Sequence, residues 1–76
     1  PLLMYLGQLA YGRSLWGKAQ SYLEASIALQ PSIAARLMLA RVLDETGQPQ
    51  KAQEQRKLVL EAVSEEERHA ALEQHS

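Results

Sequence analysis

The chain has 76 residues, a formal net charge of −1 and no cysteine. This length allows one small domain with a thin core, the lack of cysteine excludes disulfides and thiolate metal sites, and the charge gives no electrostatic basis for nucleic-acid binding. No apolar run approaches the roughly 18–20 residues that cross a bilayer, so we expect no membrane contact by these residues, and a start at Pro1 rather than Met suggests a domain of a longer protein.

The first helix is predicted over residues 1–12. Leu3, Leu6, Gly7 and Ala10 recur at helical spacing and lie on one face. The opposite face is also largely apolar, which is typical of a helix that is covered on both sides. Gly7 costs about 1 kcal/mol of helix propensity relative to Ala, and we expect close approach of the neighbouring helix to compensate.

The second helix is predicted over residues 15–29, with Ser14 as its N-cap. Its buried stripe is expected to consist of Trp16, Ala19, Leu23 and Ile27. We expect Trp16 to pack between the first two helices rather than to form a binding platform, because large aromatic side chains mostly serve cores. The helix should end at Gln30, since a proline such as Pro31 disfavours helical backbone in the residue before it.

Two further helices follow. Ser32 is predicted to cap a third helix over about residues 33–46, and Gly47 fits the position just beyond its end. Pro49 fits the first turn of a fourth helix that runs to about Val63. The residues expected to face inward are Leu39, Ala40 and Leu43 in the third helix and Ala52, Val59 and Val63 in the fourth.

A fifth helix is predicted over residues 64–76. Ser64 and Glu67 have the spacing of a capping box, in which the two side chains bind the first free backbone N–H groups of a helix. Acidic residues at this end also interact favourably with the helix dipole. Leu72 is the main large apolar residue, as expected for a solvated terminal helix. The sequence therefore predicts five helices and no strand.

The first four helices repeat with a period of about 33 residues. Shifted by that amount, Leu6 falls on Leu39, Gly7 on Ala40, Ala19 on Ala52 and Ile27 on Leu60. Such a period, with this order of small and large residues, resembles the tetratricopeptide repeat, a helix–turn–helix unit that stacks into a solenoid. The resemblance implies an all-α fold: a fragment of a right-handed α-solenoid with repeat one at 1–31, repeat two at 32–63 and a C-terminal capping helix at 64–76.

The chain departs from the tetratricopeptide pattern at three positions. Ser14 stands where Gly is usual, and Ser64 stands where repeat one has a proline. Arg56 stands where repeat one has Leu23, so we expect a thinner core at that level unless the aliphatic stem of the arginine packs there.

One subfamily resembles the chain more closely. Residues 15–31, LWGKAQSYLEASIALQP, which follow GQLAYGRS, are similar to the C-terminal repeats of the HemY proteins, and the resemblance covers about residues 1–63. HemY proteins are bacterial inner-membrane proteins associated with protohaem biogenesis, and their soluble part consists of such repeats. The resemblance implies that this chain is the soluble domain of a bacterial inner-membrane protein; it does not say on which side of the membrane the domain lies.

Tetratricopeptide domains bind partners along the inner surface made by the first helix of each unit, and the register predicts which residues form it here. These are Met4, Tyr5, Gln8, Tyr11, Leu37, Met38, Arg41, Asp44 and Glu45. The Lys and Asn clamp with which some members hold a C-terminal carboxylate is absent, because Met4, Gln8 and Met38 occupy those places. Met and Tyr favour adaptable apolar contact with a helix or an extended peptide. The alternative is that in a longer protein this face covers a neighbouring repeat or the protein's own tail.

The predicted function is a protein-interaction scaffold whose partner is a protein or peptide, with haem-pathway enzymes as candidates. Two alternatives stay open. One is a generic repeat module of an unrelated assembly. The other is direct haem or porphyrin binding by the groove, with Met4, Met38, Tyr5 or Tyr11 as the axial ligand.

Other classes of function find no support in the sequence. No nucleophile–base pair or Gly-rich phosphate loop is visible, so we expect no enzyme. We expect no resident cofactor or metal, since His69 and His75, six residues apart, do not share a helix face and are predicted to be solvated. The all-round apolar helix 1–11 would leave an exposed patch, so we predict self-association, as a homodimer.

Overall fold

A computed structural model describes residues 1–75 of the chain, except for the side chain of His75, so the expectation that this histidine is solvated lies outside the described residues. The described part is all-helical and contains no strand, as predicted. Its helices are α1 (Leu2–Gly12), α2 (Trp16–Leu29), α3 (Ile33–Glu45) and α4 (Pro49–His75). Over these residues no helix is both long enough and apolar enough to cross a membrane.

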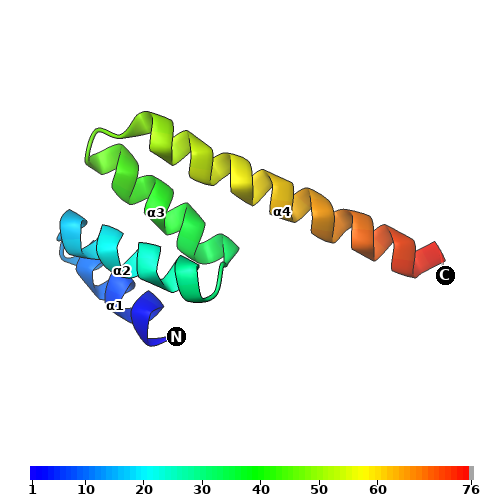
Figure 1. Cartoon of the computed structure of the whole chain (residues 1–76), viewed down its shortest axis with the longest axis horizontal. Coiled ribbons are helices and arrows are strands. Elements are labelled where there is room, and N and C mark those ends of the chain that lie inside the picture. Colours follow the sequence, from blue (N-terminus) through cyan, green and yellow to red (C-terminus); the bar gives the residue numbers. More distant parts are fainter. Residues whose placement is uncertain (76) are drawn as a thin grey trace.

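Each helix packs against the next one along the chain: α1 on α2, α2 on α3, and α3 on α4 (Figure 1). The core lies between them and is built of small and aliphatic residues. Its buried members are Ala10, Ala19, Leu23, Ala35, Leu39, Ala40, Val42, Leu43 and Ala52. Val59 of α4 is also buried. No Phe is present in the chain, so dispersion contacts among aliphatic groups and alanines hold the helices together.

The first three helices begin and end within about a residue of the predicted positions, and three predicted boundary signals, Ser32, Gly47 and Pro49, are confirmed. Ser32 is the N-cap of α3, and its hydroxyl accepts a hydrogen bond of 3.1 Å from the backbone N–H of Ala35. Gly47 follows α3 with a positive φ of 72°, and α4 begins at Pro49. Proline is tolerated at that position because it lacks a backbone N–H, and the first N–H groups of a helix have no intrahelical partner.

The turn after α1 and the turn after α3 have the same hydrogen bonds, 33 positions apart. In the first, Leu15 N–H donates to the Ala10 carbonyl at 2.9 Å, and Ser14 N–H donates to that of Tyr11 at 3.0 Å. In the second, the corresponding bonds run from Gln48 to Leu43 at 2.8 Å and from Gly47 to Asp44 at 3.2 Å. Both are Schellman motifs, which satisfy carbonyls at the end of a helix. The repeat seen in the sequence therefore extends to the backbone of the turns.

Ser14 does not cap α2, and that prediction is wrong. The N-cap of α2 is Leu15, without a side-chain hydrogen bond, and Ser14 has a positive φ of 57°. Ser14 is thus the left-handed residue of the Schellman turn that ends α1, the place that Gly47 takes after α3. A residue with a Cβ is strained in this conformation, whereas glycine is not.

We predict that Ser14→Gly stabilises the fold by up to about 1 kcal/mol, because it relieves this strain. The larger conformational entropy that glycine loses on folding offsets part of that stabilisation. Gly47→Ala is expected to destabilise the fold by about 1 kcal/mol for the opposite reason. Urea unfolding followed by circular dichroism measures both changes. Gly12→Ala is the control, since Gly12 has no positive φ and no atom within 4 Å of an added Cβ. Equal destabilisation at positions 12 and 47 would contradict the prediction.

The contact between α1 and α2 confirms the prediction made for Gly7. A Cβ on Gly7 would lie 2.9 Å from Leu23 Cδ2 and 3.0 Å from Leu23 Cγ, closer than such atoms approach. Trp16 also has its predicted structural role. It packs partly buried against the core, and its ring meets that of Tyr11 edge to face, with centroids 5.4 Å apart.

The predicted fifth helix is not separate, because α4 continues without a break through Ser64 to His75 (Figure 1). A capping box starts a helix only where its first residue leaves helical backbone, and residues 60–75 contain no Gly or Pro to make it do so. The C-terminal part of α4 extends beyond the other helices, and its described side chains from Val63 onwards are exposed. Val63 is therefore not a core residue, contrary to the prediction.

Candidate functional site

The predicted groove residues come from α1 and α3, and the repeat pairs them by position. Gln8 of α1 corresponds to Arg41 of α3, and both are exposed. Met4 and Tyr11 of α1 are half-buried and pack against the core, so only the edges of these side chains are accessible. Leu37, the counterpart of Met4, is exposed. These residues share one repeated face, since their positions along each helix differ by three or four.

Tyr5 belongs mainly to a different face of α1. It lies three residues after Leu2 and four before Leu9, and all three of these apolar side chains are exposed. Its counterpart in α3, Met38, is half-buried and packs against the core. The nine predicted residues therefore do not form one uniform surface.

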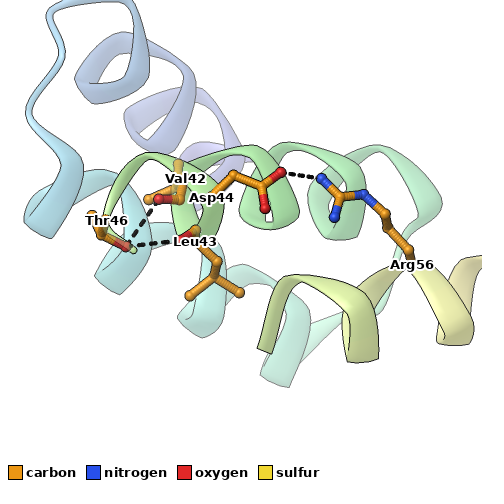
Figure 2. Close-up of polar contacts among 5 residues, drawn as sticks. All are labelled: Val42, Leu43, Asp44, Thr46 and Arg56. Atoms are coloured by element: carbon orange, nitrogen blue, oxygen red, sulfur yellow. Dashed lines mark hydrogen bonds and ion pairs between the residues drawn. The ribbon is translucent and has the colours of Figure 1, made fainter. Parts of the chain in front are cut away.

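The charges predicted at the rim have different surroundings. Asp44 forms an ion pair with Arg56 of α4, with both side chains partly exposed (Figure 2). Such an exposed pair contributes little stability, but it directs the carboxylate of Asp44 toward α4. Arg41 and Glu45 are exposed to solvent. Arg56 is only partly buried, whereas its counterpart Leu23 in repeat one is fully buried.

The end of α3 next to this ion pair is held by Thr46. Its hydroxyl donates hydrogen bonds to the Val42 and Leu43 carbonyls, at 3.0 and 3.3 Å (Figure 2). The side chain of Gln48 joins this turn to α2: its amide N–H group donates to Thr46 Oγ1 at 2.8 Å and to Gln20 Oε1 at 3.4 Å. The position of Asp44 is thus fixed from both sides, by the ion pair and by the ordered turn.

An open hollow of about 600 Å³ lies between the beginning of α1 and the end of α2. Its walls are Pro1, Leu2, Leu3, Met4, Ser26, Leu29, Gln30 and Ser32. Of the predicted groove residues, only Met4 contributes to it. A second hollow, of about 540 Å³, lies between the start of α3 and the middle of α4, and Arg36 and three glutamates line it. Both hollows are open to solvent and resemble surface depressions more than ligand cavities.

Comparison with known proteins adds no relative. No protein-family model, curated protein or solved structure matches the chain. The tetratricopeptide and HemY resemblances thus stay predictions, based on the residues quoted above.

The repeated face carries apolar, polar and charged groups together. Across α1 and α3 it offers a carboxamide, a guanidinium and a carboxylate from Gln8, Arg41 and Glu45, next to the apolar Leu37. Among the described residues no group of three His, Asp or Glu side chains gathers in a way that could hold a metal ion. Sequence reasoning did not single out Leu2 and Leu9, although both are large and apolar in a helix predicted to be apolar on all sides.

Proposed function

We propose that the chain is a protein-interaction module made of two tetratricopeptide-type units in a right-handed solenoid, followed by the extended end of α4. The observation that supports this most is the pair of Schellman turns 33 positions apart, each between two helices that pack on each other. A helix pair that recurs with its turn is the building block of helical solenoids. In this assignment α1 and α2 form unit one, and α3 and the first half of α4 form unit two.

The proposed partner site is the repeated face of α1 and α3. Its exposed part combines Leu37 with polar and charged groups, and the half-buried Met4 and Tyr11 border it. This mixture suits a helix or an extended peptide, which makes apolar contacts through a few side chains and hydrogen bonds through the others. It suits a small, highly charged ligand less well, because Arg41 is the one exposed cation among the residues assigned to this face.

In the finer form of the proposal, the module belongs to a HemY-type membrane-anchored protein and recruits late enzymes of the haem pathway. This form rests on the resemblance of residues 15–31 to the HemY repeats. A scaffold of this kind needs contact surfaces and no chemistry of its own, in agreement with the surface described above.

A pull-down of late haem-pathway enzymes tests both the partner and the surface. The variant Leu37→Asp/Arg41→Glu changes exposed residues of the proposed face. The matched control Leu72→Asp/Lys57→Glu makes the same change in charge at exposed positions of α4. We expect the wild-type module and the control to capture a pathway enzyme and the face variant to lose at least about tenfold in binding, since a buried mismatch of roughly 1.4 kcal/mol has that effect. Equal capture by both variants would refute the assigned face.

The same preparation separates the other functions. Capture of no pathway enzyme at all would reject the HemY-type form and leave a generic interaction module. Titration with haemin is expected to give no saturable Soret shift, because Met4, Met38 and Tyr11 pack against the core and would have to leave it to reach an iron. Tyr5, the fourth candidate ligand, is exposed but lines neither hollow. A saturable shift that is lost on changing one of these four residues would instead establish haem binding.

A further inference from the structure

The internal repeat allows each helix to be compared with its counterpart 33 positions later. Helix α1 corresponds to α3, and α2 corresponds to α4. Helix α3 packs on two helices, α2 before it and α4 after it. Helix α1 packs mainly on α2, which stands to α1 in repeat one as α4 stands to α3 in repeat two. A residue that is buried in α3 but exposed at the same position of α1 therefore marks the surface that α2 covers in α3 and that no main helix contact covers in α1 within the described residues.

On α1 this comparison selects three large apolar side chains. Leu2 is 68% exposed, Tyr5 55% and Leu9 45%. Their counterparts in α3 are Ala35 and Val42, which are fully buried, and Met38, which packs half-buried against the core. Spacings of three and four residues put all three side chains on one face of the helix. We call Leu2, Tyr5 and Leu9 the open α1 face.

The same comparison applied to α2 and α4 selects one face of α4. Helix α2 packs between α1 and α3, whereas the main packing contact of α4 is with α3. The buried or half-buried residues of α2 whose counterparts are more exposed are Trp16, Gln20, Leu23 and Ile27. Those counterparts are Pro49, Gln53, Arg56 and Leu60, at the same spacings of four, three and four, and we call them the open α4 face. Leu60, the counterpart of the half-buried Ile27, is 68% exposed.

We infer that the open α1 face of one molecule binds the open α4 face of a second copy of this chain, so that α1 packs on α4 as α3 packs on α2 within the molecule. Through the repeat, the two open faces correspond to sides of α2 and α3 that are buried or half-buried within the molecule, and one chain carries both. Of the α2 residues, Trp16 and Leu23 also contact α1. This continuity identifies a second copy as the occupant. The proposal concerns the ends of the stack and does not depend on the partner face of α1 and α3 described above.

The charge at the centre of the open α4 face is compatible with this contact. Arg56 occupies the position of the fully buried Leu23, but its guanidinium is held by Asp44 of the same molecule (Figure 2). A neighbouring helix can therefore cover the aliphatic stem of Arg56 without leaving an unpaired buried charge. Exposed apolar surface on the other side, from Leu2, Tyr5 and Leu9, supplies the driving force.

Head-to-tail contact of two different faces makes a specific prediction for the assembly. Such an interface does not close on itself, so association continues beyond the dimer. Two helices bury a small area, and we therefore expect weak, reversible association, visible at about 100 μM. In sedimentation equilibrium the average mass should rise above the 8.5 kDa of one chain with increasing concentration and should not level off at twice that mass.

Two single variants and their mixture test the arrangement. Tyr5→Glu disables the open α1 face, and Leu60→Glu disables the open α4 face; both sites are exposed, so the fold should persist in circular dichroism. Each variant alone is expected to be a monomer. Mixed in equal amounts they should form a heterodimer and stop there, because each supplies the face that the other lacks. Leu72→Glu, exposed and outside both faces, is the control and should associate like the wild type.

The outcomes that overturn the proposal are equally specific. Persistent self-association of Leu60→Glu, with no heterodimer in the mixture, would mean that two α1 faces pair with each other. At about 100 μM the weak association expected for a small interface should be detectable. A wild-type chain that stays monomeric at that concentration would mean that no second copy occupies these faces. If Tyr5→Glu loses helicity, Leu2→Glu repeats the test at the most exposed position of the same face.

Discussion

Replacement of Leu23 by Ala is expected to remove most of the stability of this domain. Leu23 and Val42 are the largest side chains that are fully buried, and Leu23 lies directly against Gly7 of α1. Truncation of a buried Leu to Ala typically costs about 2–5 kcal/mol, because packing is lost and a cavity remains. A single core in a chain of this length rarely supplies more than about 3–5 kcal/mol in total. The two quantities are of the same size, so the variant should be largely unfolded or close to it.

Thermal and urea unfolding, followed by circular dichroism, measure this effect. Leu72→Ala is the matched control, since it makes the same substitution at an exposed position on the extended end of α4. Surface changes of this kind are usually within about 0.5 kcal/mol of the wild type. If Leu23→Ala unfolds at the same urea concentration as Leu72→Ala, then α1 and α2 do not pack as described here.

The parts of the fold that could be predicted are those that local chemistry specifies. Pro31 ends one helix, Ser32 caps the next, and Gly47 with Pro49 separates the last two. Each of these residues constrains its own backbone whatever the rest of the molecule does. That is why the end of α2, both ends of α3 and the start of α4 agree with the sequence to within about a residue.

The prediction failed where a motif had to compete with a good helix. The spacing of Ser64 and Glu67 fits a capping box, but such a motif is favourable only if the chain leaves the helix first. No Gly or Pro forces it to do so, and residues on both sides favour helix, so the hydrogen-bond ladder simply continues. Ser14 shows the converse error. Serine is a good N-cap residue, but Ser14 is part of the Schellman turn that ends α1 and has a left-handed backbone conformation there. It therefore does not adopt the conformation of an N-cap for α2.

Predicting the core required knowing how many neighbours each helix has. Leu39, Ala40 and Leu43 were predicted and are buried, but Ala35 and Val42 were not predicted and are equally buried. Helix α3 packs on both α2 and α4, and the apolar arc of a helix packed on two sides is wider than one stripe. The signal was present in repeat one, where the corresponding positions also hold apolar residues.

The partner face could be predicted only in part, because some of its chemistry depends on contacts between distant residues. The pairing of Asp44 with Arg56 joins two helices and could not be read from spacing. Met38 packs half-buried against the core, which its place among the predicted groove residues did not indicate. By contrast, the exposure of Gln8 and Arg41 agrees with their polar character and their common place in the repeat.

A second large effect is expected from Gly7→Leu, which should unfold the domain or destabilise it by at least about 3 kcal/mol, the upper range for overpacked cores. Even a Cβ at this position would lie 2.9 Å from Leu23 Cδ2, and Leu23 is fully buried, so its side chain would have to shift within the core. The larger side chain would have to push α1 and α2 apart. Gly17→Leu is the matched control, because an added Cβ at Gly17 has no atom within 4 Å. Similar unfolding midpoints for the two variants would show that the helices do not approach closely at Gly7.

The smaller substitution Gly7→Ala identifies Leu23 as the cause. Replacing a helical glycine by Ala gains about 1 kcal/mol of helix propensity where space allows, so Gly17→Ala should stabilise the domain. Gly7→Ala should fail to do so in the wild type, because its methyl group meets Leu23. In the Leu23→Ala background that obstacle is gone, and Gly7→Ala should become stabilising, with a coupling of about 1 kcal/mol or more. Trimethylamine N-oxide, which favours compact states, keeps the weak variants measurable. Effects of Gly7→Ala that are equal in both backgrounds would mean that Leu23 is not what excludes a side chain at position 7.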